Sequence, residues 1–445
     1  MGIDKFHSWL KTNYSKSIEY KQLEDCSHLY LDLNFMIHRF ITYVSSEDIL
    51  IDKVITEIIY YIELYKPTKT VNLAADGAAN YAKVLIQKKR RINMSESKSE
   101  LNTLMVTTGT NFMNKFNEKI IEFIHKKFYE DITFHYNLSN KFGESEFKLC
   151  RMLRRNYSKS KNNSKNNSEK HLLFCNDADV ILIMLSQIHI NNIYILTKFP
   201  GGNGYTISID KLSQIFYKKY GNIPTKRYDF TLISIMLGND YFPKLKYVSF
   251  DSLWGTYYDT VSSELSIVDE SCNINLKLLS RFLGNLSMKL PKQFHKSYSL
   301  GELYSKDIKQ YLVGLQWCLK MYENGKYNYP QYLYSGQSLH PTCIHLHIDI
   351  NKLFDIQPIL PKDFYDDFDA DFIPSEIYPA LVMPYASKEL VPEKYHDVIE
   401  NKLKYMYDEE LCTACTKLKS HKDEHNIKHP KKYLDDIIKC LKNVN

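Results

Sequence analysis

The sequence contains no long apolar run, no secretory leader and no strong excess of charge of either sign. No stretch reaches the roughly 18 consecutive apolar residues that a membrane-spanning helix needs, and the amino terminus lacks the apolar core of a signal peptide. The 445 residues carry a formal net charge of only +6, so any nucleic-acid site must be a local patch. Nine cysteines, an odd number, are scattered along the chain. They favour a reducing compartment, and we expect the protein in the cytoplasm, with the nucleus as the alternative.

The length and composition are those of an ordinary globular chain. Apolar residues make up 44% and charged residues 25%, both within the usual range. Strand-like apolar runs alternate with helical patterns over residues 1–250, which predicts an α/β fold with a doubly wound, mostly parallel sheet. Residues 251–405 favour a largely helical second region, and 406–445 a charged, loosely attached tail. The polar, low-complexity segment 156–170 is expected to be a disordered surface insert.

Acidic residues repeatedly follow the apolar runs. In HLLFCNDADVILIML, residues 171–185, a strand-like run ends at Asp177 and Asp179, which share a face because they are two residues apart. Two carboxylates this close repel each other unless a cation lies between them. The carboxyl ends of strands are also where open α/β sheets hold their reactive groups. The acids that end apolar segments are Asp32, Asp76, Glu144, Glu146, Asp177, Asp179 and Asp240.

Each of these acids, taken alone, has an ordinary explanation as a helix cap or a turn residue. Seven of them at one edge of a sheet would repel strongly without counter-ions. We therefore interpret them as catalytic ligands of Mg²⁺ or Mn²⁺, most simply of two ions. Two such ions catalyse phosphodiester hydrolysis, because one activates the attacking water and the other stabilises the leaving oxygen.

A donor-rich helix face follows Asp76 directly. Lys83, Gln87, Arg90 and Arg91 are spaced so that, on a helix, they fall within about 100° of arc. We call these four residues the basic face. Arg and Gln donors that converge on one spot suit a terminal phosphate, whose oxygens accept several charge-assisted hydrogen bonds. A merely solvated basic surface is the alternative interpretation.

Several segments, in order, resemble the signature segments of the XRN family of 5′→3′ exoribonucleases. They are LYLDLNFMIH, AADGAANYAKVLIQKKRR, TTGTNFM, GESEFK, CNDADVILIML and DFTLISIMLGNDYFPKL, followed by YLVGLQW (311–317) and YPALVMPYASKELVP (378–392). The resemblance implies a PIN/FEN-like nuclease core in which the seven acids ligate the metal ions. It also implies that the basic face holds a 5′-monophosphate and that His38 stacks on the 5′ base.

The chain departs from the family pattern in four ways. Phe147 stands where the family has a histidine, and Asp4 stands where it has a proline. The tryptophan that partners the stacking histidine is absent, and Tyr327 or Tyr329 is the nearest substitute, since tyrosine still offers a stacking face. The large carboxy-terminal extension of cytoplasmic members is also missing, so the chain resembles a minimal catalytic core.

The resemblance implies processive degradation of single-stranded RNA with a 5′-monophosphate. Single-stranded DNA is a second expected substrate, and no membrane partner is expected. One alternative is a flap-endonuclease-like, structure-specific DNA nuclease. Such enzymes continue from an LGND-like loop into a helix–hairpin–helix, whereas this chain continues with Tyr241, Phe242 and Pro243. Another alternative is an inactive nucleic-acid-binding scaffold, which the presence of all seven acids disfavours.

The tail contains residues that could suggest a zinc site. They are Cys412, Cys415, His421 and His425. The gap between the cysteines and the histidines is much shorter than the roughly 12-residue spacer of a zinc finger. We therefore expect no zinc there.

Overall fold

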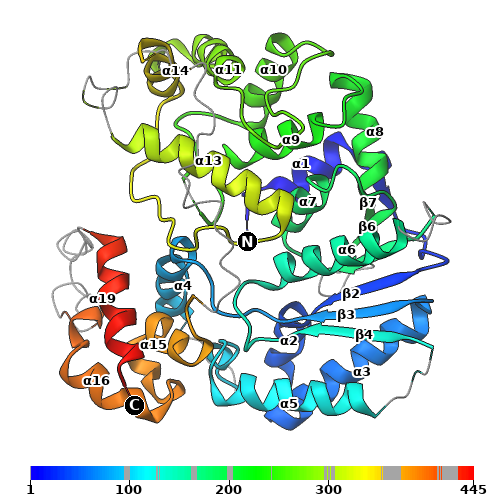
Figure 1. Cartoon of the computed structure of the whole chain (residues 1–445), viewed down its shortest axis with the longest axis vertical. Coiled ribbons are helices and arrows are strands. Elements are labelled where there is room, and N and C mark those ends of the chain that lie inside the picture. Colours follow the sequence, from blue (N-terminus) through cyan, green and yellow to red (C-terminus); the bar gives the residue numbers. More distant parts are fainter. Residues whose placement is uncertain are drawn as a thin grey trace. The chain divides into compact units, whose positions relative to one another are not determined.

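Seven strands in the described part of the chain form one mixed sheet, in the order β1-β7-β6-β5-β2-β3-β4 (Figure 1). The computed structural model describes residues 2–94, 101–126, 129, 131–161, 168–197, 204–241, 243–294, 298, 301, 306–351, 353, 372–407, 410, 412 and 429–444. Strands β3–β4 and β5–β6 pair in parallel, whereas β7 is antiparallel to both β6 and β1. The strands are β1 (Ile18–Glu19), β2 (His28–Asp32), β3 (Thr70–Ala74), β4 (Thr133–Asn137), β5 (His171–Phe174), β6 (Ile193–Thr197) and β7 (Tyr205–Ser208). The α/β class and the mostly parallel sheet predicted from the sequence are confirmed.

The chain divides into two compact units, each made of several segments. Unit 1 comprises Met1–Leu29, Cys150–Tyr329 and Tyr334–Asp367, and unit 2 comprises Tyr30–Leu149, Pro330–Leu333 and Phe368–Asn445. Strand β2 and helix α6 (Ser145–Lys161) each begin in one unit and end in the other. The domains expected at 1–250, 251–405 and 406–445 are continuous segments of the chain, whereas each compact unit combines several separate segments. The boundaries of the expected domains stay predictions.

Unit 1 contains β1, β5, β6 and β7 together with a set of helices around a strongly apolar core. All eight residues of α7 are buried, and Trp9 stacks on Phe250 and Trp254 with ring centroids 4.8 and 5.8 Å apart. The helices are α1 (Phe6–Asn13), α7 (Ala178–Leu185), α8 (Ile209–Tyr220), α9 (Lys226–Ile235), α10 (Phe250–Thr260), α11 (Leu276–Lys289), α13 (Lys306–Asn324) and α14 (Pro341–Ile350), with short 3₁₀ helices at Ser15–Ser17 and Lys292–Phe294.

Unit 2 contains β3, β4 and two groups of helices. The first group is α2 (Leu33–Phe40), α3 (Glu47–Tyr65), α4 (Tyr81–Met94) and α5 (Asn111–His125), with 3₁₀ helices at Ile41–Tyr43 and Thr103–Met105. The second group is α15 (Tyr378–Val382), α16 (His396–Asn401) and α19 (Pro430–Lys442), with 3₁₀ helices at Ser375–Ile377, Tyr385–Leu390, Glu393–Tyr395 and Lys404–Tyr407. Residues from α4, α15, α16 and α19 share one apolar cluster.

Helix α19 is firmly packed, so the expectation of a loosely attached tail is wrong for this segment. Leu434, Ile437, Ile438 and Leu441 are at most 5% exposed and belong to the shared apolar cluster of unit 2. Their spacing forms one apolar stripe along the helix. Near the middle of the helix, Asp435 accepts a hydrogen bond of 2.7 Å from the Tyr81 hydroxyl. The charged residues that dominate the composition lie on the other faces of the helix.

The expected disordered insert at 156–170 is also wrong at both of its ends. Helix α6 continues to Lys161, and Asn156 is only 3% exposed. After the gap, Glu169 is buried and pairs with His28 at 2.9 Å. Residues 162–167 lie outside the described residues. These contacts could not be predicted from the composition of the segment, because a single buried pair leaves no periodic signal in the sequence.

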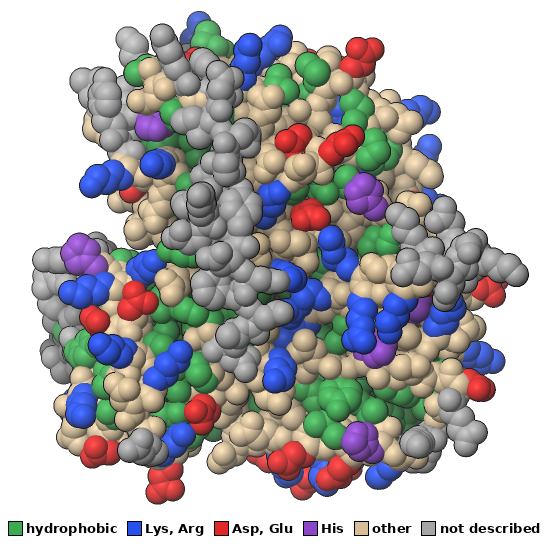
Figure 2. Space-filling view, in the orientation of Figure 1, with side chains coloured by type: hydrophobic (Ala, Val, Ile, Leu, Met, Phe, Trp, Pro, Cys, Tyr) green, Lys and Arg blue, Asp and Glu red, His purple; other side chains and the backbone are tan. Residues whose placement is uncertain are grey.

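Charge and apolarity of the described surface agree with the composition. Figure 2 shows Lys and Arg side chains interspersed with Asp and Glu side chains on the face in view, as expected for a chain with a net charge of only +6. Among the described helices, none combines the length and the apolar character needed to cross a bilayer.

Candidate functional site

Two of the predicted acids in unit 1 stand together at the start of α7. Asp177 is the N-cap of this helix, and its carboxylate accepts a hydrogen bond of 3.2 Å from the backbone N–H of Asp179. Gly2, with φ +80°, packs against both side chains: a Cβ there would lie 3.0 Å from Asp177 Oδ1 and 3.2 Å from Asp179 Oδ1. One oxygen of each carboxylate therefore approaches a common point. The shared strand face expected from their spacing is not the reason, because β5 ends at Phe174 and Asp179 lies in α7.

The third acid of unit 1, Asp240, is buried at 4% exposure in the loop that follows α9. Its neighbour Asn239 is tied to α13, since Asn239 Nδ2 donates to the Tyr322 hydroxyl at 3.3 Å. The charge of the nearby Asp179 carboxylate adds to burial in raising the pKa of Tyr322. The loop that carries Asp240 and the start of α7 thus both lie near one side chain of α13.

Unit 2 brings its four acids onto three connected chain segments. Asp32 ends β2 and caps α2, where it accepts a hydrogen bond from Phe35 N at 3.2 Å. Asp76 follows β3, and its carboxylate accepts a hydrogen bond of 2.8 Å from Ser145 N at the start of α6. The Asp76 N–H donates in turn to Asn34 Oδ1 at 2.8 Å. Glu144 and Glu146 flank Ser145 and are 3% and 7% exposed.

The basic face lies on α4 in the same unit. Lys83 is 4% exposed and forms a buried ion pair with Glu144. Gln87 Oε1 accepts hydrogen bonds from Arg91 Nη1 at 2.9 Å and from the Tyr378 hydroxyl at 2.6 Å. Arg91 Nε donates to Thr107 Oγ1 at 3.1 Å. These contacts fix the side chains in place, which disfavours a merely solvated surface, while the phosphate-binding role stays a prediction.

Electrostatics link the basic face to the acids of unit 2. Burial lowers the pKa of Arg91, and the nearby Tyr378 and Asp76 oppose that shift, whereas Arg90 adds to it. His38 lies near both Asp76 and Arg91. Burial lowers the pKa of the His38 imidazole, Arg91 adds to the shift and Asp76 opposes it. His38 is therefore a neutral ring beside the acids at neutral pH, which suits a stacking role.

The two tyrosines proposed as stacking partners belong to unit 1. Tyr327 is 6% exposed, and Tyr329 adopts the left-handed region with φ +52°. The turn between them is held by Trp317, whose indole N–H donates to Asn328 O at 2.5 Å. Because His38 belongs to unit 2, its pairing with either tyrosine stays a prediction. The convergence of all seven acids, three from unit 1 and four from unit 2, stays a prediction for the same reason.

The donor set of both units fits a hard divalent cation by its chemistry, since carboxylate oxygens are the ligands that Mg²⁺ and Mn²⁺ prefer. The paired oxygens of Asp177 and Asp179 are the most direct sign of this fit. Within the described ranges, no three His, Cys, Asp or Glu side chains form a ready-made group for a metal ion. Of the tail residues considered for zinc, Cys415, His421 and His425 lie outside the described residues.

Several residues around the acids were not singled out from the sequence. Lys148 is fully buried, and its ammonium donates to the carbonyl oxygens of Ala75, Leu138 and Lys141 at 2.7, 3.0 and 2.8 Å. It therefore braces the end of β3 next to Asp76. Lys148, Thr107 and Tyr378 all lie in segments that carried the family resemblance, which was the one available signal. Their contacts join distant parts of the chain and could not be read from spacing.

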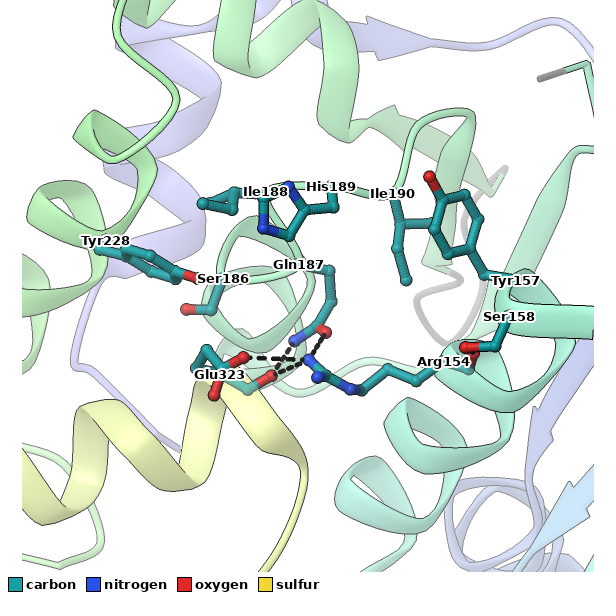
Figure 3. Close-up of a pocket in the computed structure, with 10 residues that line it drawn as sticks. All are labelled: Arg154, Tyr157, Ser158, Ser186, Gln187, Ile188, His189, Ile190, Tyr228 and Glu323. Atoms are coloured by element: carbon teal, nitrogen blue, oxygen red, sulfur yellow. Dashed lines mark hydrogen bonds and ion pairs between the residues drawn. The ribbon is translucent and has the colours of Figure 1, made fainter. Parts of the chain in front are cut away.

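Unit 1 also contains a pocket of about 390 Å³ with mixed polar and apolar walls (Figure 3). Arg154 crosses it, and its Nη1 donates to Gln187 Oε1 at 3.0 Å and to the carbonyl oxygen of Glu323 at 2.7 Å. The lining residues are Arg154, Tyr157, Ser158, Ser186, Gln187, Ile188, His189, Ile190, Tyr228 and Glu323. The arginine, the glutamine and the glutamate thus bind one another and join α6, the end of α7 and the end of α13.

Comparison with known proteins gives both a family and several relatives. Residues 1–198 match the family described as XRN 5′-3′ exonuclease N-terminus. The chain is similar to human 5′-3′ exoribonuclease 1, with 23% identity over 348 residues that cover 64% of this chain and 20% of that protein. It is also similar to 5′-3′ exoribonuclease 1 of Saccharomyces cerevisiae, with 24% identity over 368 residues that cover 69% of this chain and 24% of that protein.

The chain spans less than a quarter of the length of these curated relatives. Among solved structures, it is similar to the catalytic core of Rad2 in complex with DNA substrate, with a TM-score of 0.40 and 15% identity over 79% of this chain and 94% of that one. A TM-score this low carries no argument about function.

Proposed function

Because residues 1–198 match the XRN 5′-3′ exonuclease N-terminus family and the chain is similar to 5′-3′ exoribonucleases 1, we propose that it is a metal-dependent 5′→3′ exoribonuclease of the XRN family. Its proposed substrate is single-stranded RNA with a 5′-monophosphate, degraded processively, and single-stranded DNA is a proposed second substrate. The proposed cofactors are Mg²⁺ or Mn²⁺, most simply two ions, held by the seven acids Asp32, Asp76, Glu144, Glu146, Asp177, Asp179 and Asp240.

One observation carries the proposal: unit 2 holds fixed cationic donors next to acids. Lys83 is paired with Glu144, and Asp76 is close enough to Arg91 for its charge to raise the pKa of the guanidinium. A phosphate bound by Lys83 and Arg91 would therefore lie beside carboxylates that can hold a divalent ion. This arrangement suits an enzyme that recognises the end of a phosphodiester chain and cleaves nearby.

The side chains around Arg91 explain how a terminal phosphate would be recognised. Thr107 accepts a hydrogen bond from Nε, and Gln87 accepts one from Nη1, so two of the five guanidinium donors orient the group. Tyr378 in turn holds Gln87 at 2.6 Å. A guanidinium oriented before binding loses little side-chain entropy when it meets a phosphate.

The proposed reaction divides between the ions and the chain. Bound divalent ions would supply an activated water and stabilise the leaving oxygen. The acids would hold the ions, the basic face would bind the 5′-phosphate, and His38 would stack on the first base. None of these contacts reads base identity, so degradation without sequence preference is expected.

The test is time-resolved product analysis on end-labelled RNA. Matched RNAs with a 5′-monophosphate, a 5′-triphosphate or a 5′-hydroxyl are incubated with Mg²⁺, Mn²⁺, Ca²⁺ or EDTA. We expect mononucleotides released from the 5′ end of the monophosphate RNA, with Mg²⁺ or Mn²⁺ required. Cleavage of flap DNA with none of monophosphate RNA would support the endonuclease alternative. Binding without any cleavage would support the scaffold.

A further inference from the structure

The pocket of unit 1 lies at the opposite end of α7 from Asp177 and Asp179. Residues 186–190, which follow the carboxyl end of this helix, form part of the pocket wall. The helix has eight residues, and a helix of that length is about 12 Å long. The pocket is therefore separate from the proposed metal site. Its volume of about 390 Å³ falls within the range of sites that hold small molecules.

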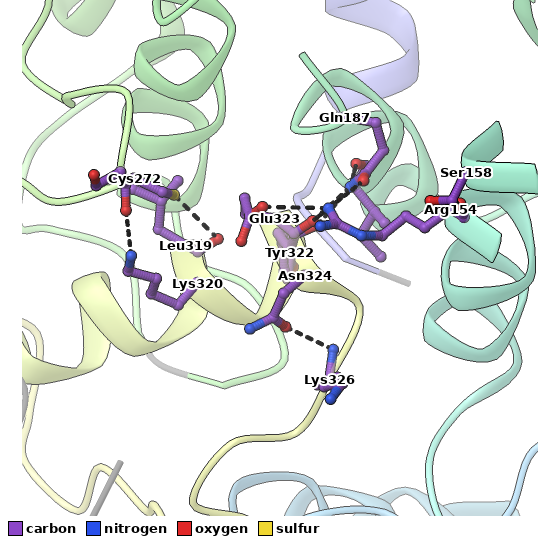
Figure 4. A network of polar contacts seen from close by, with 12 residues as sticks. Arg154, Ser158, Gln187, Cys272, Leu319, Lys320, Tyr322, Glu323, Asn324 and Lys326 are labelled. Carbon is purple, nitrogen blue, oxygen red and sulfur yellow. Dashed lines mark hydrogen bonds and ion pairs between the residues drawn. The ribbon is translucent and has the colours of Figure 1, made fainter. Parts of the chain in front are cut away.

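Arg154, on the wall of this pocket, is held at one of its terminal nitrogens. Its Nη1 donates to Gln187 Oε1 at 3.0 Å, to Glu323 O at 2.7 Å and to Glu323 Oε1 at 3.2 Å (Figure 4). Gln187 is fixed in turn, because its Nε2 donates to the carbonyl oxygens of Ile183 at 2.9 Å and of Tyr322 and Glu323 at 3.0 Å each. The guanidinium is therefore oriented before a ligand binds, which lowers the entropic cost of binding.

Two groups of this network remain available to a ligand. Among the described residues, none accepts a hydrogen bond from Nε or Nη2 of Arg154, and 39% of that side chain is exposed. Two such parallel N–H donors match two oxygens of one phosphate group. Glu323 Oε2 likewise accepts no hydrogen bond within the described part of the chain. A carboxylate oxygen in this position can accept a hydrogen bond from a ribose hydroxyl, as acidic residues do in dinucleotide sites.

The carboxyl end of α7 does not oppose a bound anion. Free carbonyl oxygens at the end of a helix carry partial negative charge and would repel a phosphate. Here the buried Arg227 binds two of them, since its Nε donates to Leu185 O at 2.7 Å and its Nη2 to Met184 O at 3.0 Å. The charge of Glu323 is compensated by Arg154. A phosphate at Arg154 would therefore meet no uncompensated negative charge from these two sources.

The remaining walls of the pocket are aromatic and apolar. Figure 3 shows Tyr157 beside Ile190 at one end of the pocket and Tyr228 at the other. Tyr157 is half-buried and Ile190 is 4% exposed, and a tyrosine ring offers a face on which a base can stack. Burial raises the pKa of the Tyr228 phenol, so its hydroxyl stays protonated as a donor. The pocket thus suits a ligand that combines a flat ring, hydroxyl groups and an oxyanion.

We propose that this pocket binds a ribonucleoside 5′-monophosphate. The phosphate binds Nε and Nη2 of Arg154, the ribose hydroxyls bind Oε2 of Glu323, and the base packs on Tyr157. The choice of this ligand rests on the proposed function, because an exoribonuclease releases such nucleotides, whereas the donors and the apolar wall of the pocket do not depend on it. The pocket belongs to unit 1 and the basic face to unit 2, so the two are different sites.

The experiment titrates the full chain with adenosine 5′-monophosphate (AMP) in the presence of EDTA and measures the heat of binding. We expect Arg154→Gln to weaken AMP binding by at least about 10-fold, since a hydrogen bond to a charged group contributes that factor or more. Arg155→Gln is the matched control, because Arg155 is exposed on α6, carries the same charge and does not line the pocket. It should leave AMP binding unchanged. Arg91→Ala, which removes an arginine of the basic face, should also keep this binding.

A second variant and a second ligand keep the test decisive if Arg154→Gln does not fold. Ser158 lines the pocket at an exposed position, so Ser158→Trp should fill the pocket without disturbing the core and should abolish AMP binding. Adenosine lacks the phosphate, so it should bind more weakly than AMP, and equally to wild type and Arg154→Gln.

The outcomes separate this inference from the proposed function. An AMP affinity of folded Arg154→Gln within about threefold of wild type, or an equal loss in Arg155→Gln, would overturn the inference. AMP binding retained in Ser158→Trp would also overturn it. A wild-type chain that cleaves RNA but shows no saturable AMP binding would overturn the pocket assignment and leave the proposed function. Arg154-dependent AMP binding in a chain that cleaves no RNA would do the reverse.

Discussion

Replacing Arg91 by alanine should separate RNA substrates by the group at their 5′ end. Arg91 is held by Thr107 at 3.1 Å and by Gln87 at 2.9 Å, so its remaining donors are oriented before a phosphate arrives. A hydrogen bond to a charged group contributes about 1.5–3 kcal/mol. At about 1.4 kcal/mol for each factor of ten, the loss of kcat/KM on monophosphate RNA should be about 10- to 150-fold. On hydroxyl-ended RNA there is no phosphate contact to lose, so we expect a change within about threefold.

The assay compares kcat/KM on two RNAs of one sequence, which differ only in their 5′ group, for each variant. Lys89→Ala is the matched control, because Lys89 is exposed on α4 and its removal lowers the charge of the same helix by one. It should weaken both substrates slightly and in a salt-dependent way. His38→Ala should weaken both substrates equally, since a stacking contact with the first base does not depend on the phosphate.

Equal losses on the two RNAs from Arg91→Ala would refute the reasoning. They would show that the basic face acts through general attraction to nucleic acid, as a solvated surface does. The basic face could then no longer be assigned as a phosphate site. The main physical reason to prefer an exonuclease over a flap endonuclease would be lost as well.

Three further predictions concern the metal site, the carboxy-terminal helix and pH. Asp177→Asn keeps the N-cap of α7, because asparagine caps as well as aspartate, so the melting temperature should stay nearly unchanged. Mg²⁺-dependent hydrolysis should fall by at least about 100-fold. Activity within tenfold of wild type would contradict the metal role. Ile437→Ala removes a fully buried side chain of α19 and should lower the free energy of unfolding by about 2–5 kcal/mol, measured by urea titration. Lys439→Ala, at an exposed position of the same helix, should not lower it. Equal, small effects of the two substitutions would show that α19 does not dock in solution. Burial raises the pKa of Asp229 to about 6, above the value of about 3.9 of an unfolded chain, so the folded state binds this proton more tightly. The stability that the proton contributes is therefore present below about pH 4 and is lost as the pH rises through about 6; the free energy of unfolding of wild type relative to Asp229→Asn should fall over that range, and a difference independent of pH would contradict it.

The tertiary structure contradicted the predictions made from the sequence where contacts join distant segments. The polar composition of 156–170 predicted disorder, but Glu169 pairs with His28, 141 residues away. The charged composition of the tail predicted loose attachment, but the apolar stripe of α19 packs in the cluster of α4 and α15. Both errors have one origin: average composition reports how much apolar surface a segment has, not whether a few apolar or paired side chains find a complementary surface.

The sequence by itself determined the features that depend on local spacing. Alternation of strand-like and helical runs was enough for the α/β class. The acids at or just after the ends of β2, β3 and β5 could be named because strand ends are marked by the switch in hydrophobic period. Spacing along α4 likewise predicted that the basic face would lie on one side of a helix. Only the tertiary structure decided which side chains orient these groups. Tyr378, for example, reaches Gln87 across 291 residues of sequence. A hydrogen bond between distant segments requires one donor at one position, so it leaves no periodic pattern, and it exists only once packing has brought the two segments together.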